Sequence, residues 1–399
     1  MKDWKPYTFN EAVECNPKIS IKKGKIIENC EMEDIEPNYK FLYPREGKLY
    51  KGSNAKFQNG DTVFARITPC LENGKIAQIK GLIKNNGIGS TEFFVFRGKK
   101  NISDNDFVFY LSKTNLVRDT AINSMTGASG RQRADIKAVK KVLVLLPSLP
   151  IQQRIASILS AYDDLIEVNN QRIKLLEQTA SQLYKEWFVR MRFPNYKKAK
   201  FVKGIPIGWD IDKVKNILHR HKFGKTYRPE ELTETGNVIV IDQSTDALLG
   251  YHNNEPDHNA TSQSPMIIFG DHTCKMELIV ESFSLAENVI PISTKDTMPI
   301  YFAYYLIESL VETTEYKRHW NELTSKPVLI PKKELQIKFS EIVKPFFEQI
   351  NILTKQNTQL RQIRDRLLPR LVSGKLQVKE MDKTKKTVRK YRAVEAKTI

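Results

Sequence analysis

The sequence predicts an α+β protein built as a repeat, with two tandem mixed α/β domains separated by two long helices that form a pseudo-twofold antiparallel coiled coil. Two observations lead to this prediction. Residues 146–170 and 330–354, which start 184 positions apart, both open with an apolar residue and a proline and continue with apolar residues at helical spacing. In front of each such segment, short apolar runs alternate with turn residues, which is typical of strands.

The apolar runs and turn residues also predict a domain organisation. Strands are expected at 58–67, 90–96, 237–242, 265–271 and 277–283, and a shorter helix is expected at 299–312. The predicted parts are a first domain at 1–147, a helix at 148–192, a second domain at 193–327, a helix at 328–377 and a basic, disordered tail at 378–399.

Both long helices show the seven-residue apolar repeat of a coiled coil. Ser148 and Pro150 are start signals for the first helix, and Gly374 is the expected C-cap of the second. The alternative is that each helix packs only on its own domain, but the repeat keeps the same phase in both copies. The seam positions are Ile155, Leu159, Tyr162, Ile166, Asn169, Ile173, Leu176, Ala180, Leu183 and Trp187, and then Phe339, Val343, Phe346, Ile350, Leu353, Asn357, Leu360, Arg364, Leu367 and Leu371.

One antiparallel register satisfies the two asparagines of the seams. If the numbers of paired positions sum to 526, Asn169 lies opposite Asn357. A buried amide without a partner costs about 1–3 kcal/mol, so this register is favoured. Pro345 lies off both seams, and we expect a bend there rather than a break. The same register pairs Ile155 with Leu371, Leu159 with Leu367, Ile166 with Leu360, Leu176 with Ile350, Ala180 with Phe346 and Trp187 with Phe339.

The composition limits the classes of partner and compartment. A formal net charge of +18 over 399 residues favours a polyanionic partner, above all nucleic acid, although a merely basic surface is the alternative. No apolar run reaches the ~18 residues of a membrane helix, and the start of the chain lacks the apolar core of a signal peptide. We therefore expect a soluble cytoplasmic protein without a membrane partner. The cysteines show no paired spacing, which suits a reducing compartment: Cys15, Cys30, Cys70 and Cys274.

Several stretches resemble one known family. Residues 145–188, ending in KEWF, and residues 329–376, ending in LLPRLVSGKL, resemble the two conserved regions of the specificity subunits of type I restriction-modification enzymes. GIPIGW at 204–209 resembles the entry to their second recognition domain. FQNGDTVFARITPCLENGKIA at 57–77 and FGDHT at 269–273 resemble strand-turn segments of the two recognition domains. The resemblance spans nearly the whole chain in the right order.

This resemblance implies a specific division of labour. Such a subunit is not an enzyme: two target-recognition domains each read one half of a split double-stranded DNA sequence. The helices set the spacer and dock two methylation subunits, which hold S-adenosylmethionine, so this chain would bind no cofactor. Restriction/translocase subunits complete the assembly. The residues expected to form the spacer and partner-docking region are Ile155, Leu159, Ile166, Asn169, Leu176, Trp187, Phe339, Phe346, Ile350, Asn357, Leu360 and Leu367.

The candidate DNA contacts are basic and hydroxyl side chains in loops. Arginines and backbone amides are the usual contacts to phosphates and guanine edges. A solvated surface loop is the alternative at each site. In the first domain the candidates are Arg131, Arg133 and Lys137 in a glycine-containing loop, and Arg66, Thr68 and Lys75 around a strand-turn.

The second domain offers three such segments. Residues 219–228 interleave basic residues with Phe223 and Tyr227, which suits nucleic acid. Residues 316–321 precede the second long helix as the first domain's loop precedes the first, but they lack its glycines. The candidates are Arg220, Lys222, Lys225 and Arg228, then His272, Thr273 and Lys275 at a strand end, and then Lys317 and Arg318.

Catalytic motifs are not evident in the sequence. His252, Asp257 and His258 match no standard zinc spacing, so no metal site is expected. The chain has no GxxxxGK[ST] segment and no Pro-Pro-aromatic methyltransferase motif. Nuclease pairs are conceivable at Asp61 with Lys75 or Asp271 with Lys275, against structural turn carboxylates. Two alternatives stay open: a self-contained two-domain DNA-binding enzyme or regulator, and a coiled-coil scaffold without a DNA role.

Overall fold

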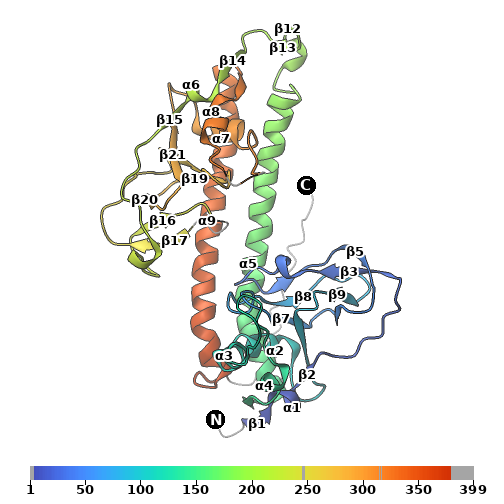
Figure 1. The fold of residues 1–399 in the computed structure, drawn as a ribbon. Coiled ribbons are helices and arrows are strands. Elements are labelled where there is room, and N and C mark those ends of the chain that lie inside the picture. Colours follow the sequence, from blue (N-terminus) through green and yellow to red (C-terminus); the bar gives the residue numbers. More distant parts are fainter. Residues whose placement is uncertain (1–3, 245–247, 314, 316, 379–399) are drawn as a thin grey trace, which may run out of the picture. The chain divides into compact units, whose positions relative to one another are not determined.

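The chain folds into two compact units. The computed structural model describes residues 4–244, 248–313, 315 and 317–378 (Figure 1). Unit 1 comprises Met1–Asn169 with Lys355–Ile399, and unit 2 comprises Asn170–Thr354. Each unit therefore combines a mixed α/β region with one stretch of each long helix, α5 (Leu149–Tyr184) and α9 (Lys333–Val372). Beyond Val378, the predicted tail lies outside the described residues.

The strands of unit 1 include the apolar runs that the sequence predicted to be strands. The five-stranded sheet has the order β2 (Val13–Cys15), β10 (Phe93–Gly98), β7 (Thr62–Ala65), β8 (Ile76–Ile79) and β4 (Phe41–Leu42). The four-stranded sheet has the order β5 (Arg45–Leu49), β3 (Ile26–Cys30), β9 (Gly87–Gly89) and β6 (Ala55–Phe57). β1 (Lys5–Thr8) pairs antiparallel with β11 (Leu143–Leu146), directly before α5.

Short helices cover the five-stranded sheet of unit 1. Thr8 and Glu11 form a capping box at the start of α1, and Asp104 accepts a hydrogen bond from the Phe107 amide at 3.0 Å to cap α2. Phe64 of β7 and Phe107 of α2 share one buried cluster with residues from both long helices, so the core joins sheet and helices. The helices are α1 (Phe9–Ala12), α2 (Asn105–Ser112), α3 (Asn115–Asn123) and α4 (Ile136–Lys140).

Unit 2 has a similar set of elements. Its four-stranded sheet has the order β15 (Leu218–Arg220), β21 (Val289–Thr294), β18 (Met266–Gly270) and β19 (Met276–Ile279). A second sheet has the order β17 (Leu248–His252), β16 (Val238–Ile241) and β20 (Phe283–Leu285). β12 (Phe201–Val202) pairs with β13 (Ile205–Pro206), and β14 (Asp210–Lys213) pairs with β22 (Pro327–Ile330). The helices are α6 (Val214–Ile217), α7 (Ile300–Ile307) and α8 (Trp320–Ser325).

One strand prediction is wrong. The run 277–283 is not a single strand, because its first half belongs to β19 and its last residue begins β20. β19 pairs antiparallel with β18 in one sheet, whereas β20 pairs parallel with β16 in the other. The chain therefore changes sheets within this run, and a continuous apolar pattern does not reveal such a change.

The connectivity of unit 1 recurs in unit 2. The order β2-β10-β7-β8 corresponds to β15-β21-β18-β19. β3 pairs antiparallel with β5 and parallel with β9, and β16 pairs in the same two ways with β17 and β20. A strand pair, β1-β11 or β14-β22, precedes each long helix. The predicted fold class, a repeated mixed α/β domain with long helices, is confirmed.

The predicted seams form the buried stripes of α5 and α9. Asn169 donates a hydrogen bond to Asn357 at 2.9 Å, and both residues are 2% exposed, which confirms the predicted register. Asp163 meets Arg364 in the same unit, so rising numbers on α5 face falling numbers on α9 and the helices are antiparallel there. In unit 2 the rings of Trp187 and Phe339 lie 6.1 Å apart, as the same register requires.

The ends of the long helices follow their sequence signals. The Gln152 amide donates to the Ser148 carbonyl at 3.0 Å, which closes the first turn of α5. Gly374 has a φ of +74°, a backbone conformation that glycine adopts easily, and follows the end of α9. α9 continues through Pro345 without a break, and this proline is exposed.

Candidate nucleic-acid interface

Both units build the same frame from a turn and a loop. In unit 1 a turn follows β7, where the Ala65 amide donates to the Lys75 carbonyl at 3.0 Å, and the loop before α4 attaches through Ala134, whose amide donates to the Arg66 carbonyl at 2.8 Å. Unit 2 repeats both bonds. After β18 the Gly270 amide donates to the Lys275 carbonyl at 2.8 Å, and before α8 the His319 amide donates to the Asp271 carbonyl at 2.8 Å. The loops at 126–133 and 317–319 are thus structural counterparts, although only the first contains glycines.

In unit 1 a carboxylate holds two of the predicted arginines. Arg133 donates to Glu92 from Nε at 3.0 Å and from Nη2 at 2.7 Å, and these hydrogen bonds lower the pKa of Glu92. Arg66 Nε lies 3.8 Å from the same carboxylate, and its guanidinium lies over the Phe94 ring at 5.1 Å. The structure therefore brings Arg66 and Arg133 together at the turn and orients both.

The other candidates of unit 1 divide into exposed and anchored side chains. Arg131 is exposed near the tip of the loop, whereas Lys137 is exposed in the first turn of α4 and not in the loop where it was predicted. Thr68 donates its hydroxyl to the Gln132 carbonyl at 3.1 Å and so joins turn to loop. Lys75 donates its ammonium to the Met32 carbonyl at 2.9 Å, a contact that ties its side chain to the protein.

In unit 2 Asp271 organises the frame. Its Oδ1 accepts from the backbone amides of His319 and Trp320 at 3.0 and 2.9 Å, and its other oxygen lies 3.8 Å from the guanidinium of Arg318. His272 Nδ1 lies 3.1 Å from the Lys317 carbonyl. The turn and the loop that sequence reasoning treated separately therefore form one surface.

The other two candidates of this turn, Thr273 and Lys275, have fewer groups available for contact with DNA. Thr273 is exposed, and the Lys275 amide lies 3.4 Å from its hydroxyl oxygen. Lys275 donates to the Ser244 carbonyl at 2.8 Å and pairs with Glu277 at 2.8 Å. A lysine already engaged by a carbonyl and a carboxylate has fewer donors left for a phosphate.

The basic segment 219–228 does not act as one cluster. Lys225 pairs with Glu231 at 2.6 Å and lies over the Tyr227 ring at 4.4 Å, which in turn stacks on His252 at 4.3 Å. Arg228 is exposed and its amide donates to Glu231 at 3.0 Å. Lys222 is exposed as well. Arg220, by contrast, lies over the rings of Phe223 and Trp320, at 5.0 and 5.6 Å, and Trp320 belongs to the frame of Asp271.

The pairs considered for nuclease chemistry have structural roles. Asp61 forms a two-point ion pair with Arg97, both distances 2.7 Å, while Lys75 bonds to the Met32 carbonyl instead. Asp271 caps α8, as described above. Within the described ranges no group of three or more His, Cys, Asp or Glu side chains lies together as a metal site would require, and no helix there is long and apolar enough to cross a membrane.

The residues predicted for the spacer and for partner docking are mainly inside the protein. Buried members face the opposite helix or their own domain and are not accessible to a partner: Ile155, Leu159, Ile166, Asn169, Trp187, Phe339 and Asn357. The other members are seam residues that are only half-buried: Leu176, Phe346, Ile350, Leu360 and Leu367. Their burial suits packing within the protein rather than contact with a partner.

Sequence reasoning missed a buried ionic network in unit 1. Arg364 of α9 pairs with Asp163 of α5, and each side chain is 2% exposed. Asp163 also accepts a hydrogen bond from the Tyr110 hydroxyl. Beside it, Lys40 donates to Ser160 at 2.7 Å and to Asp106 at 2.8 Å. An arginine at a seam position was the available signal, because a buried cation requires a partner.

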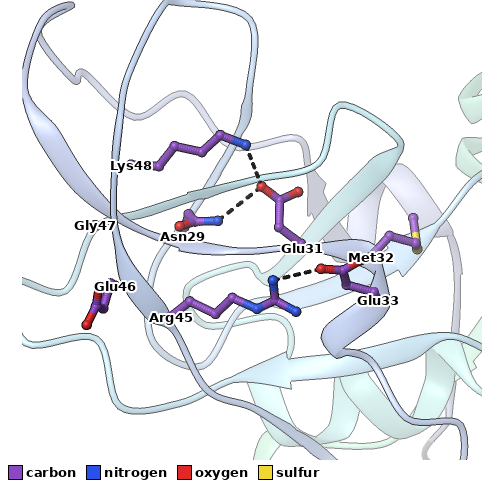
Figure 2. A pocket seen from close by; sticks show the side chains of 8 residues that line it. All are labelled: Asn29, Glu31, Met32, Glu33, Arg45, Glu46, Gly47 and Lys48. Atoms are coloured by element: carbon purple, nitrogen blue, oxygen red, sulfur yellow. Dashed lines mark hydrogen bonds and ion pairs between the residues drawn. The ribbon is translucent and has the colours of Figure 1, made fainter. Parts of the chain in front are cut away.

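An open pocket of about 760 Å³ lies elsewhere in unit 1 and does not suit a phosphate (Figure 2). Lys48 and Asn29 bond to Glu31 at 2.8 and 3.0 Å, and Arg45 bonds to Glu33 at 2.7 Å. Glu46 adds a third carboxylate to the lining. Both cations are thus paired within an acidic lining, which repels polyanions.

Comparison with known proteins shows which family the chain resembles. The model of the type I restriction modification DNA specificity domain matches residues 1–178. The type I restriction enzyme MjaIX specificity subunit of Methanocaldococcus jannaschii is 25% identical over 382 residues, which cover 86% of this chain and 85% of that protein. The chain is therefore similar, over most of its length, to type I restriction-modification specificity subunits.

Two further proteins show the same similarity. The EcoAI specificity subunit of Escherichia coli is 30% identical over 156 residues, which are 38% of this chain and 26% of that protein. The crystal structure of the type I restriction-modification S subunit from M. genitalium covers 92% of this chain and 96% of that chain, with 16% identity and a TM-score of 0.53. At this identity the similarity concerns the fold of the specificity subunit.

Proposed function

We propose that this chain is a specificity subunit that reads a bipartite double-stranded DNA target, with one half-site for each unit. The observation that supports this most directly is the turn-and-loop frame, which occurs in both units and presents arginine or lysine side chains in each. Repetition of one frame suits a split site, because each half needs its own reader. The net charge of +18 supports a polyanionic ligand.

The proposal assigns the chemistry to other subunits. Two methylation subunits would bind S-adenosylmethionine, restriction/translocase subunits would complete the complex, and this chain would catalyse nothing and hold no cofactor. The engagement of Asp61 by Arg97 and of Asp271 by α8 supports a non-catalytic role for the carboxylates considered above. The long helices would act as the spacer, with the Asn169–Asn357 hydrogen bond selecting their register.

A methylation assay tests the proposal. The full chain is purified alone and together with methylation subunits, and each preparation receives labelled S-adenosylmethionine and DNA. We expect methylation only in the complex, at a split sequence, and binding that weakens steeply as salt concentration rises. Methylation by the chain alone, or salt-independent binding, would contradict the proposal.

Exchange of the first domain tests the division into half-sites. Replacing residues 1–147 by the corresponding domain of another family member is expected to change one half-site and leave the other unchanged. Inserting one heptad into each long helix is expected to lengthen the spacer without changing either half-site. Altered bases in both half-sites after either change would argue against separate readers.

A further inference from the structure

Arg220 occupies a position that differs in chemistry between the units. It lies opposite Ile292 in the β15–β21 pair, and Cys15 lies opposite Phe96 in the corresponding β2–β10 pair. Phe96 and Ile292 are both the fourth residues of their strands, so Cys15 and Arg220 are counterparts. Unit 2 therefore carries an exposed guanidinium at the end of an edge strand where unit 1 carries a thiol.

Two aromatic rings orient this guanidinium. Arg220 Cζ lies 5.0 Å from the centroid of Phe223 and 5.6 Å from that of Trp320. Trp320 is itself fixed, because its amide donates to Asp271 at 2.9 Å and its ring packs 6.1 Å from that of Phe269. Stacking of a planar guanidinium on rings restricts its rotamers while leaving its N–H edges unused.

Among the residues that the structure describes, no carboxylate pairs with Arg220. Throughout the described ranges it forms no ion pair or hydrogen bond through its side chain, whereas Arg133 binds Glu92 at 2.7 Å and Arg318 lies 3.8 Å from Asp271. Phe223 is 44% exposed, so the stack is at the surface. The arrangement keeps a cation oriented and its five donors available.

We propose that Arg220 determines specificity in the second half-site by donating two hydrogen bonds to O6 and N7 of one guanine in the major groove. This is the base edge that presents two acceptors with the spacing of a guanidinium fork. Phe223 and Trp320 act as positioning residues that hold the fork. This proposal rests on the proposed DNA-recognition function. It adds the base that is recognised and the side chain that recognises it.

Selection from randomised DNA tests the assignment. The full chain, in complex with methylation subunits, selects binding sites from a pool randomised in both half-sites. For Arg220→Ala and Arg220→Lys we expect the preference for guanine at one position of one half-site to fall roughly 5- to 150-fold, with the other half-site unchanged. Arg220→Lys retains the charge but loses the fork, so total affinity should fall less than in Arg220→Ala.

Arg318→Ala is the matched control. It removes a charge from the same surface, but Arg318 is 75% exposed and faces Asp271. We expect it to weaken binding to all sequences equally and to leave base preferences intact. Circular dichroism and thermal unfolding of each variant establish that the fold is retained.

Substitutions of Phe223 test the positioning role. Phe223→Leu should reduce the preference for guanine at the same position that Arg220→Lys affects. Phe223→Tyr, which keeps the ring, should retain this preference. A purely structural role would lower affinity without changing the preferred base.

Three outcomes are decisive. An unchanged base preference in Arg220→Ala, or an equal loss of affinity for all sequences, would overturn the assignment while leaving DNA recognition intact. Absence of any sequence preference in the unsubstituted complex would overturn the proposed function itself. A guanine preference lost in both Arg220 variants and retained in Arg318→Ala supports the assignment.

Discussion

Units 1 and 2 join the long helices to a short helix, α2 or α7, by different chemistry. Unit 1 uses the buried ion pair of Asp163 and Arg364, and the Tyr110 hydroxyl bonds to Asp163. At the positions 184 residues away, unit 2 has Phe347 and Ala180. Tyr305, like Tyr110 the sixth residue of its helix, packs its ring 5.8 Å from Phe347 instead.

The neighbouring residues extend the contrast. In unit 1 Lys40 adds a buried ammonium, and burial together with Asp163 raises the pKa of Tyr110. In unit 2 the ring of Phe339 lies within 6.4 Å of the rings of Tyr184, Trp187, Phe188, Phe302 and Tyr305. Burial of aromatic rings contributes free energy without the cost of desolvating two charges, whereas a buried ion pair is nearly neutral and mainly selects one geometry. The same backbone frame thus tolerates two kinds of interior.

The largest effect is expected from breaking the ion pair. Arg364→Ala leaves the Asp163 carboxylate buried without its cation, and we expect unit 1 to lose about 3–5 kcal/mol of unfolding free energy. Hydrogen exchange, read separately for each unit, measures the loss and localises it. Arg366→Ala, at an exposed position of α9, is the control and should change stability by less than about 0.5 kcal/mol. A loss confined to unit 2, or equal in both variants, would contradict the comparison.

Removing both charges together should not lower the unfolding free energy of unit 1. The double substitution Asp163→Leu with Arg364→Met gives unit 1 an apolar junction like that of unit 2. We expect stability equal to the unsubstituted protein or up to about 1–4 kcal/mol above it. Denaturant unfolding of the full chain compares the double variant with each single variant. If the double variant is as unstable as Arg364→Ala, the ion pair contributes net stability and the comparison needs revision.

Lys113, beside the ionic network, should make the stability of unit 1 depend on pH. Burial lowers the pKa of Lys113 to about 8, from 10.5 in the unfolded chain. Between these values the unfolded chain binds more protons, so the stability of unit 1 should rise with pH from about 8 to 10. Lys113→Met should remove this rise and raise stability at pH 7 by roughly 2 kcal/mol. Thermal unfolding across this range measures both effects, and an unchanged pH profile in the variant would disprove the assignment.

The smallest effect is expected at the asparagine pair. Asn169→Ala removes the hydrogen bond to Asn357 and should cost about 1 kcal/mol in unit 1. Asn169→Leu with Asn357→Leu should recover stability but weaken the register, which cysteine cross-linking between the helices would detect. A single cross-linked register in that double variant would show that the apolar seams alone are sufficient to select the register.

The long helices and their register could be predicted because the information is local and repeated. A heptad pattern identifies the buried stripe, and a single polar position in each helix has one low-cost pairing, Asn169 with Asn357. The ion pair of Arg364 was not predicted, because Asp163 lies one position off the seam and is buried by Tyr110 from a different part of the chain. The correspondence of the two loops was also hidden, since backbone hydrogen bonds to Arg66 and Asp271 carry it rather than shared residue types.

For the candidate DNA contacts, the sequence likewise could not show which side chains are available to DNA. Residue type predicted that Arg133, Arg220 and Lys75 were basic groups in loops, and their chemistry was readable without a structure. Packing then separated them: Glu92 engages Arg133, the Met32 carbonyl engages Lys75, and rings orient Arg220. Periodicity and composition decide helices, repeats and charge because these depend on neighbours along the chain. The partner of each charged side chain depends on residues far away in sequence, so only the folded chain decides which cations remain available.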